Sequence, residues 1–348
     1  MSQLVKKRVD GLDILKCIAA FLIICIHAPF FGEFGKYVTA IARIGVPIFL
    51  MITGYFYTST INKNREKTQI KKILSLTLGA NILFFVFNIC LSIFKGTLSQ
   101  YLAECFSFKS ILSFLLLNDS PFCYHLWYLG ALLYTLLIVA LLRKFVKCWE
   151  KILYIITPLL LAVDLIFGKY SIVIFGYEPI PYKFLRNFLF VGIPYFTIGL
   201  YISRHQQLFS SLKKRTIILC IASVLFTATT ILERFVLVSL NVNATRDHYF
   251  SSTLLALVLF ILFENTAWND RELGFLKKIG REYSLLIYII HPITITLIRG
   301  VLGKIGMISI YDYTAPFLVF SVSLAFSALY YYIKNTIKAR RAKSNIIN

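Results

Sequence analysis

The chain has 348 residues, of which 58% are apolar, 16% are aromatic and only 15% are charged, and its mean hydropathy is +0.74. An ordinary soluble domain carries about 25% charged residues, so this composition excludes one and indicates an integral membrane protein. The net charge of +21 raises nucleic-acid binding as a possibility, which the placement of the basic residues below argues against.

Apolar runs of about 18 residues or more are long enough to cross a bilayer as helices, and we count about ten of them. They predict an all-α, polytopic membrane helix bundle that forms a single domain over 1–348. The segment 98–124 is compatible with an amphipathic surface segment or with a re-entrant one. In chain order the ten runs lie near 12–32, 38–58, 73–94, 125–142, 152–168, 183–203, 216–240, 249–266, 283–301 and 314–333.

The basic residues set the expected orientation. Most of the 37 Lys and Arg lie in the two terminal segments and in every second connection between runs. The positive-inside rule makes these segments cytoplasmic, with both termini inside, which predicts a multi-pass protein of a cell membrane. Much of the basicity is then topological, and we expect membrane lipid and an anionic cytoplasmic cofactor as partners and no nucleic acid. The scattered cysteines show no metal-ligand spacing, so no metal is expected.

The first run carries Asp13, Lys16 and His27 within "LDILKCIAAFLIICIHAP". On a helix, Lys16 and His27 lie within about 20° of the same face and about 16 Å apart along the axis, and Asp13 lies within about 60° of Lys16. A polar stripe therefore runs along this helix. Asp13 and Lys16 are equally compatible with an ion pair at the cytoplasmic boundary. His27 lies deeper in hydrocarbon, where ionisable groups usually face a cavity.

The second run, "IARIGVPIFLMITGYFY", contains Arg43 and then Pro47. Because a short loop joins the first two runs, we expect them to pack as an antiparallel pair. Arg43 then lies about 7 Å to the outer side of its span centre, the depth estimated for His27, and the two side chains are expected to meet. An arginine at this depth requires an anion, a carboxylate or several acceptors, and a structural ion pair within the bundle is the alternative.

Two further segments hold polar candidates in the outer halves of their runs. "CYHLWYLGAL" places His125, Trp127 and Tyr128 at the outer mouth of the fourth run, where an aromatic belt is the alternative to a substrate site. Glu233, in "TTILERFVL" of the seventh run, is a candidate carboxylate for Arg43 or for substrate.

The ninth run, "YSLLIYIIHPI", places His291 near the middle of its span, one turn from Tyr288 and directly before Pro292. A histidine at this depth suggests a functional site. A structural histidine that is hydrogen-bonded to a backbone carbonyl is the alternative.

At these residues the chain resembles the acyltransferase-3 family of multispan membrane acyltransferases. The resemblance rests on Asp13, Lys16 and His27, on Arg43 with "VPIFLMITGYFY", and on "YHLWYLGALL" and "SLLIYIIHP" in this order and spacing. It extends over nearly the whole chain. Within the family the pattern is most similar to the membrane portion of the serine or alanine racemases of glycopeptide-resistance clusters.

The resemblance implies transfer of an acyl group, often acetyl from cytoplasmic acetyl-CoA, to a hydroxyl of an outward-facing cell-envelope glycan or similar acceptor. It makes His27 the essential residue, with Lys16 and Arg43 in the family's basic positions. The chain departs from the family in two places, since Lys16 replaces an arginine and Gln69 and Lys72 stand near two expected arginines. The loss of the bidentate guanidinium puts the donor in doubt.

The chemistry is consistent with these residue types. Transfer to an alcohol requires a base near neutral pKa, which a histidine such as His27 supplies, and a cation such as Arg43 where the oxyanion develops. Lys16, Lys71 and Lys72 are the candidates for attracting the nucleotide of acyl-CoA.

Two alternatives from other classes stay open: transport of a small amino acid such as serine, as the racemase-linked relatives suggest, and a non-catalytic partner of an envelope enzyme. Asp13, His125, Trp127, Tyr128, Glu233, Tyr288 and His291 complete the predicted site as substrate-binding residues.

Overall fold

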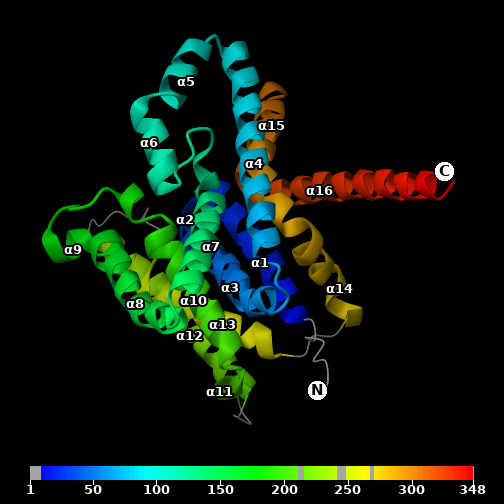
Figure 1. Ribbon diagram of the computed structural model, residues 1–348. Coiled ribbons are helices and arrows are strands. Elements are labelled where there is room, and N and C mark those ends of the chain that lie inside the picture. Colours follow the sequence, from blue (N-terminus) through cyan, green and yellow to red (C-terminus); the bar gives the residue numbers. More distant parts are fainter. Residues whose placement is uncertain (1–8, 211–214, 241–247, 267–269, 348) are drawn as a thin grey trace. The chain divides into compact units, whose positions relative to one another are not determined.

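The structure is a computed structural model that describes residues 9–210, 215–240, 248–266 and 270–347. These residues form α-helices joined by short 3-10 and π-helical segments, and no strand occurs among them. The predicted all-α class is therefore confirmed. The chain divides into two compact units, which are described separately: unit 1 contains residues 43–266, and unit 2 contains residues 9–42 and 267–348 (Figure 1).

The elements follow one another with short connections. Unit 1 contains α3 (Gly45–Asn62), α4 (Glu66–Lys95), α5 (Leu98–Cys105), α6 (Phe108–Leu117), η1 (Tyr124–Leu126), α7 (Trp127–Phe145), α8 (Trp149–Val163), η2 (Asp164–Lys169), α9 (Ser171–Phe175), η3 (Tyr182–Phe184), η4 (Phe188–Gly192), α10 (Ile193–Arg204), α11 (Gln206–Ser210), α12 (Arg215–Ser239) and α13 (Phe250–Asn265). Unit 2 contains α1 (Asp10–His27), α2 (Gly32–Ala42), α14 (Asp270–Lys278), η5 (Ile279–Tyr283), α15 (Ser284–Lys304) and α16 (Ile308–Ile347).

Every apolar run expected from the sequence contains a helix, but the predicted count of about ten spans is not confirmed. In the described part of the chain, seven helical stretches are long and apolar enough to cross a membrane, or eight if α5 and α6, bent by 49° to one another, form one broken or re-entrant span. The expected spans 183–203 and 249–266 form shorter apolar helices, Phe188–Arg204 and Phe250–Asn265. The first run, α1, carries Asp10, Asp13 and Lys16 within its 18 residues.

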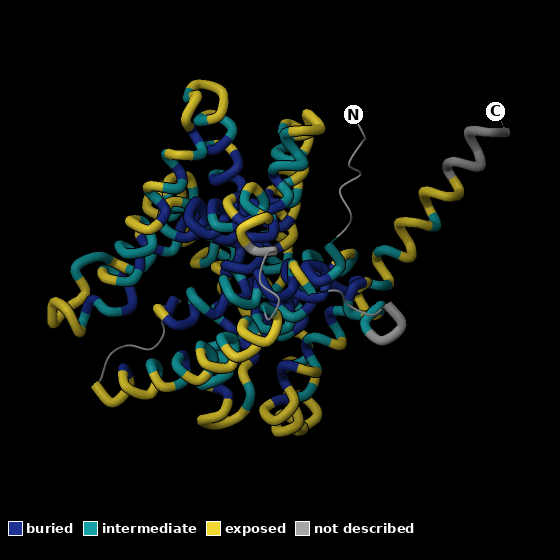
Figure 2. Tube along the Cα trace, turned by 90° about the horizontal axis from the view of Figure 1, so that it is seen from below, coloured by how far each residue is buried: buried dark blue, intermediate teal, exposed yellow. Residues whose placement is uncertain are grey.

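The outer surfaces of the long helices are apolar, as a helix in lipid requires. On α4, Leu78, Ile82 and Val86 are spaced one turn apart and are about half exposed. Figure 2 shows exposed residues along the elements of both units, including residues 328–340 of α16. The exposed apolar stripe on α4 is therefore consistent with a lipid-facing side.

The expected span 38–58 lies within Gly32–Asn62, a helical stretch that is long and apolar enough to cross a membrane, and a short break at Arg43 and Ile44 separates α2 from α3 within it. Pro47 explains the break, since its ring clashes with the carbonyl four residues earlier, which is that of Arg43. Pro47 instead lies in the first turn of α3, where a backbone N–H has no helical partner to lose. Arg43 thus lies between two helices rather than inside a regular helix.

Within unit 1, α3 and α10 cross at the closest distance that two backbones allow. A Cβ on Gly54 of α3 would lie 1.9 Å from the carbonyl oxygen of Phe196, and a Cβ on Gly199 of α10 would lie 1.9 Å from that of Met51. Small residues at such crossings maximise van der Waals contact, which drives helix association in lipid. The two glycines therefore fix the centre of unit 1.

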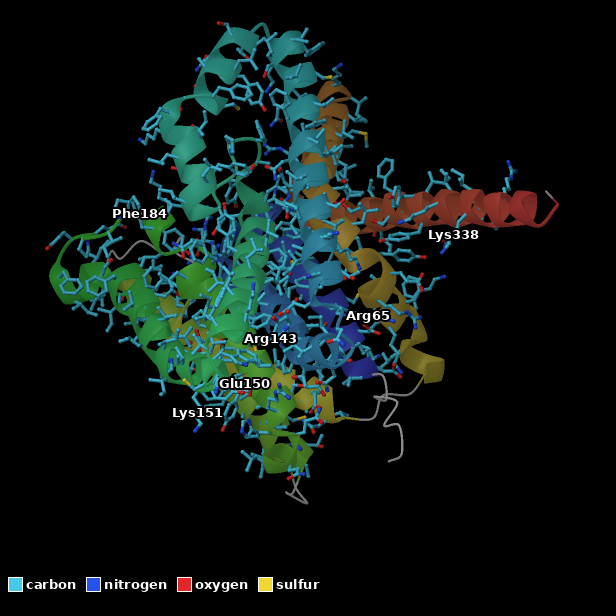
Figure 3. All side chains as sticks on the ribbon, in the orientation of Figure 1. Arg65, Arg143, Glu150, Lys151, Phe184 and Lys338 are labelled. Atoms are coloured by element: carbon cyan, nitrogen blue, oxygen red, sulfur yellow. The ribbon has the colours of Figure 1, made fainter. Side chains whose placement is uncertain are left out.

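Ion pairs gather at one end of unit 1. Glu66 at the start of α4 pairs with Arg143 near the end of α7, and Glu150 at the start of α8 pairs with Arg204 at the end of α10. Figure 3 shows Arg143 and Glu150 near this end and Phe184 away from it. The pairs involve segments that the positive-inside rule assigns to the cytoplasm.

In unit 2, α1 packs against η5 and α14 near its N-terminus. A Cβ on Gly280 would lie 1.7 Å from the carbonyl oxygen of Asp13, so only glycine fits there. The Lys277 ammonium lies 3.3 Å from the Asp10 carboxylate. Farther along α1, the Phe21 ring stacks on that of Phe317 of α16 at 5.5 Å between centroids. These contacts fix α1 against α14, η5 and α16.

Candidate functional site

Two imidazole rings meet in unit 2. His27 is the last residue of α1 and His291 lies inside α15, and their ring centroids are 5.0 Å apart with an interplanar angle of 34°. His291 is fully buried and His27 is partly buried. The carbonyl end of a helix favours a cation, so the terminus of α1 favours a positive charge on His27. The sequence predicted each histidine as a site residue, and the structure brings them together.

Pro292 explains how His291 is held. A proline has no N–H, so the carbonyl of Tyr288, four residues earlier, lacks its usual helical donor. The Nδ1–H of His291 donates to this carbonyl oxygen instead, at 2.7 Å. Since a carbonyl only accepts, the proton of neutral His291 is on Nδ1 and the lone pair is on Nε2. The structure thus contains the carbonyl hydrogen bond that the structural alternative requires, and the same bond fixes the tautomer that a functional role requires. Substrate binding by His291 and Tyr288 stays a prediction.

Asp13 and Lys16 form the expected ion pair one turn from the start of α1. The Lys16 ammonium lies 3.0 Å from an Asp13 carboxylate oxygen, and the Asp13 side chain is 8% exposed. This contact is the boundary pair that the sequence left as an alternative. Lys71 and Lys72, the other predicted cofactor-binding residues, are exposed near the start of α4. The roles of Asp13 in substrate binding and of these three lysines in cofactor binding stay predictions.

Arg43 belongs to unit 1, where its charge acts on the hydroxyl of Tyr249 just before α13. The expected meeting of Arg43 with His27 joins the two units and stays a prediction. The charge of a second guanidinium, that of Arg234 on α12, acts on the same hydroxyl. The ammonium of Lys169 lies 3.8 Å from the centroid of the Tyr249 ring. One cation therefore lies over the ring of a buried tyrosine, and the charges of two others act on its hydroxyl.

A buried carboxylate–imidazole pair completes this region. The Nδ1–H of His248 donates to an Asp164 carboxylate oxygen at 2.7 Å, and both side chains are 3% exposed. The Tyr195 ring lies 5.5 Å from that of His248 between centroids. Asp164 and Lys169 are the first and last residues of η2, and π-helical segments are frequent at functional sites. We call the following residues the Tyr249 cluster: Arg43, Asp164, Lys169, Arg234, His248 and Tyr249.

Sequence reasoning missed most of the Tyr249 cluster. The available signal was Asp164 inside the apolar run 152–168 with Lys169 directly after it, since ionisable residues at membrane depth are functional candidates. His248 carried no such signal, because it precedes the run 249–266. Its pairing with Asp164, far away in the sequence, depends on the tertiary fold.

The predicted residues of the fourth run are buried at the start of α7. His125 is 2% exposed; its Nδ1 lies 2.9 Å from the Cys123 sulfur, and its ring lies 4.9 Å from that of Phe84 between centroids. The Tyr128 ring lies 6.1 Å from that of Phe49. These contacts are compatible with packing, and substrate binding by His125 and Tyr128 stays a prediction.

Trp127 belongs to a group of aromatic rings around one cation. The guanidinium carbon of Arg186 lies 5.1 Å from the ring centroid of Tyr124, 5.4 Å from that of Trp127 and 5.7 Å from that of Tyr182. Such cation–π contacts orient both the cation and the rings. Substrate binding by Trp127 also stays a prediction.

Glu233 holds the beginning of α13. Its carboxylate accepts hydrogen bonds at 3.1 Å from the backbone N–H groups of Phe250 and Ser251, and the Ser251 hydroxyl also donates to it. The first N–H groups of a helix have no helical acceptor, and a carboxylate there also complements the helix dipole. The structure thus gives Glu233 a structural task, and its role in substrate binding stays a prediction.

No group of three or more His, Cys, Asp or Glu in the described part of the chain is arranged to hold a metal ion. The ionisable groups instead form the imidazole pair of unit 2 and the Tyr249 cluster of unit 1. Seven helical stretches of the described residues are long and apolar enough to cross a membrane. The molecule is therefore a multi-pass, all-helical membrane protein with buried ionisable sites.

The acyltransferase-3 family, described as an acyltransferase domain, matches residues 9–332, and the chain belongs to this family of membrane acyltransferases. Two amino-acid racemases of Enterococcus faecalis are similar to it: one is 26% identical over 327 residues, covering 85% of this chain and 42% of the racemase, and the other is 32% identical over 130 residues, covering 35% and 17%. The chain thus spans less than half the length of these relatives. No solved structure matches the chain significantly.

Proposed function

We propose that this protein transfers an acyl group, acetyl in the simplest case, from cytoplasmic acyl-CoA to a hydroxyl of an acceptor at the outer face of a bacterial plasma membrane. The acceptor belongs to the cell-envelope glycans or to small hydroxyl compounds. The observation that carries this proposal is the His27–His291 pair in unit 2. Family membership supports acyl transfer in general.

His27 is the general base in this proposal. It takes the proton of the acceptor hydroxyl as that oxygen attacks the thioester carbonyl, and the C–O bond forms as the C–S bond breaks. The proton then passes from His27 to the departing thiolate, which leaves as CoA. The helix end at His27 stabilises the imidazolium that exists between these steps.

His291 is a positioning residue for His27. Its Nδ1–H is engaged by the Tyr288 carbonyl, so its Nε2 offers a lone pair to a protonated nitrogen of His27. An acceptor in this place orients a catalytic imidazole and favours its charged form, as the carboxylate does in an Asp–His–Ser triad. Arg43 is proposed to stabilise the oxyanion or orient the acceptor.

Lys16, Lys71 and Lys72 are proposed to attract the anionic nucleotide of acyl-CoA. Lys71 and Lys72 are exposed near the start of α4, which suits a diffusing anion. Lys16 is already paired with Asp13, so it would contribute to the local electrostatic potential rather than bind the nucleotide directly. Exposed cations of this kind act mainly on the rate of encounter and are screened by salt.

The experiment measures CoA release and label transfer from labelled acetyl-CoA to envelope material, using the full chain in lipid nanodiscs. We expect His27→Ala to lower the rate by about a hundredfold or more, and His291→Ala to lower it less. His205→Ala is the matched control, because its Nδ1 also contacts a helix carbonyl, that of Tyr201, at 3.0 Å but it belongs to unit 1.

Undiminished transfer by His27→Ala would contradict the proposed role. An equal loss with His205→Ala would also contradict it, because the effect would then not depend on the imidazole pair. Accumulation of labelled serine in proteoliposomes without any acyl donor would favour the transport alternative. Donor-dependent CoA release that rises with added acceptor would favour the enzyme.

A further inference from the structure

Three aromatic rings of unit 1 surround the guanidinium group of Arg186. The rings are those of Tyr124 in η1, Trp127 at the start of α7 and Tyr182 in η3, and their centroids lie 5.1, 5.4 and 5.7 Å from the guanidinium carbon. We call these four residues the Arg186 cage. Rings from three elements restrict the rotamers of a long side chain, so less conformational entropy is left to lose when a ligand binds. The guanidinium is therefore positioned in advance.

The buried side chain of Asn118 links the two backbone segments that carry the cage. Its Nδ2–H donates to the carbonyl oxygen of Trp127 at 3.1 Å, and its Oδ1 accepts from the backbone N–H of Phe188 at 3.0 Å. A Cβ on Gly130 would lie only 2.8 Å from the Cβ of Asn118, so the asparagine packs closely against α7. The segment that carries Arg186 is thus held next to the helix that carries Trp127.

Arg186 differs from the paired arginines of unit 1. Arg143 and Arg204 each form an ion pair with a glutamate. Within the described part of the chain, Arg186 forms no ion pair and no side-chain hydrogen bond. Aromatic rings attract its positive charge but accept no ordinary hydrogen bond, so the five N–H donors of the guanidinium remain available to a ligand. A positioned guanidinium of this kind is suited to bind an anion.

The Arg186 cage lies at one boundary of a membrane-length helix. Tyr124–Phe145 is a helical stretch of 22 residues that is apolar enough to cross a membrane. It is about 33 Å long, close to the thickness of about 30 Å of a hydrocarbon core. Tyr124 and Trp127 then lie at the depth of the lipid headgroups, where such residues are enriched. Since Arg143 is at the end assigned to the cytoplasm, the cage lies at the outer face.

Exposed apolar side chains accompany the cage. Phe184 is 43% exposed and Leu189 is 36% exposed, two residues before and three residues after Arg186, and Tyr124 is 51% exposed. Figure 3 shows Phe184 away from the end of unit 1 that carries Arg143. A cation beside exposed apolar surface at headgroup depth suits a ligand with an anionic head and hydrocarbon chains. A soluble anion would make no use of this apolar surface.

We propose that the Arg186 cage binds the phosphodiester group of a phospholipid in the outer leaflet of the membrane. The guanidinium donates two parallel N–H···O bonds to the two non-ester oxygens of the phosphate, an arrangement that a lysine cannot reproduce. The acyl chains of the lipid lie along the apolar surface that includes Phe184 and Leu189. This binding involves neither acyl-CoA nor an acceptor, so the inference goes beyond the proposed function and does not depend on it.

The test compares a phospholipid with a neutral lipid on the full chain. Nanodiscs of digalactosyldiacylglycerol receive increasing amounts of phosphatidylglycerol with the same acyl chains. Retained lipid is measured by native mass spectrometry, and binding is also followed by the rise in Tm. We expect phosphatidylglycerol to be preferred by at least about tenfold. Glycerophosphoglycerol, its deacylated headgroup, is added alone up to about 10 mM and should bind at least about tenfold more weakly than the lipid.

The variants test whether Arg186 is the binding residue. Arg186→Gln should reduce the preference for phosphatidylglycerol to less than about twofold. Arg299→Gln is the matched control, because the guanidinium carbon of Arg299 also lies over a ring, that of Tyr311 at 5.6 Å, but has one ring instead of three, and it should retain the preference. If Arg186→Gln does not fold, Arg186→Lys keeps the charge without the planar fork and should still reduce the preference by about threefold or more.

Four results would each overturn the proposal. They are equal retention of the two lipids by the native protein, an unchanged preference in Arg186→Gln and Arg186→Lys, an equal loss in Arg299→Gln, and binding of glycerophosphoglycerol as tight as that of the lipid, which would make the ligand a soluble phosphate ester. Binding is measured without acyl donor or acceptor, so a failure leaves the acyltransferase proposal standing. Undiminished transfer by His27→Ala would remove that proposal and leave lipid binding by Arg186 standing.

Discussion

The carbonyl oxygen of Tyr288 accepts a hydrogen bond from Nδ1 of His291, 2.7 Å away, because Pro292 cannot donate to it. The dipeptide His291–Pro292 thus both frees a backbone acceptor and supplies a side-chain donor for it. This arrangement fixes the ring orientation and tautomer of a buried histidine with residues of a single helix. No distant residue is needed to specify it.

Pro292→Ala should separate stability from activity. The new N–H at position 292 competes with His291 for the Tyr288 carbonyl, so the ring loses its fixed tautomer and acyl transfer falls by about tenfold. The helix loses an internal proline, and the free energy of unfolding rises by up to about 3 kcal/mol. Transfer assays and thermal unfolding measure the two effects.

Pro316→Ala is the matched control. Pro316 is also an internal helix proline of unit 2, but the residue directly before it is Ala315 rather than a histidine. It should change stability in the same direction and leave transfer unaltered. Equal transfer by Pro292→Ala and the native protein would show that the tautomer of His291 does not matter.

Asp164 should be among the most sensitive positions for stability. Asp164→Ala leaves His248 buried without its acceptor, and removing one partner of a buried pair costs about 3–5 kcal/mol. Asp164→Asn keeps an acceptor oxygen and should cost about 1 kcal/mol. Thermal unfolding of the purified protein measures both. Asp312→Ala, at an exposed position of α16, is the control, and its free energy of unfolding should stay within about 0.5 kcal/mol of that of the native protein. An equally small change for Asp164→Ala would show that the Asp164–His248 pair does not stabilise the fold.

Structural features that depend on residues close together in the sequence could be predicted from the sequence alone. Helical class follows from apolar run length, and the contact of Lys16 with Asp13 follows from their spacing of three residues. The break at Arg43 follows from Pro47, which forbids a regular helix there. Polar residues within apolar runs, such as His27 and His291, were found because they are costly in lipid.

The sequence was insufficient where partners come from separate helices. The Asp164–His248 pair joins a residue that precedes α12 in the sequence to one that follows it. The Lys169–Tyr249 contact does the same. Glu233 was singled out as a candidate carboxylate for Arg43 or for substrate, but the structure shows it accepting from backbone N–H groups at the start of α13, which no side-chain pattern reveals. Long-range packing decides these contacts.

Substitutions of Glu233 test whether its carboxylate has a structural or a substrate-binding role. Glu233→Ala leaves the Ser251 N–H at the start of α13 without its acceptor, whereas the Phe250 N–H keeps the Tyr170 hydroxyl at 3.0 Å, so we expect a loss of about 1–3 kcal/mol in the free energy of unfolding. Glu233→Gln retains an acceptor oxygen and should lose less. Both are measured by thermal unfolding together with KM for acceptor. A raised KM with unchanged Tm for Glu233→Ala would instead assign this carboxylate to substrate.

The crossing of α3 and α10 should not tolerate a methyl group. Gly54→Ala or Gly199→Ala places a Cβ against a backbone carbonyl 1.9 Å away, so the helices must separate at a cost of about 1–3 kcal/mol. Gly79→Ala on α4 is the control, because nothing lies within 4 Å of its Cβ position, and it should be neutral or slightly stabilising. Equal unfolding temperatures for all three variants would mean that the crossing is not so tight.

Two cysteines outside the membrane-spanning segments test the orientation. Cys148, between α7 and α8, is exposed and lies in a segment that the positive-inside rule makes cytoplasmic. A membrane-impermeant maleimide should therefore label it in inside-out vesicles and spare it in right-side-out ones. Cys148→Ser should abolish this labelling.

Cys123 should react slowly from the opposite face. Burial raises the pKa of its thiol to about 11, although hydrogen bonds from the backbone of His125 and Tyr124 oppose this shift. Well under about 0.1% of the thiol is then ionised near pH 7.5, and its reaction rate should rise about tenfold per pH unit because the thiolate is the nucleophile. Fast labelling of Cys148 in right-side-out vesicles would reverse the assigned orientation and place the Tyr249 cluster at the cytoplasmic face.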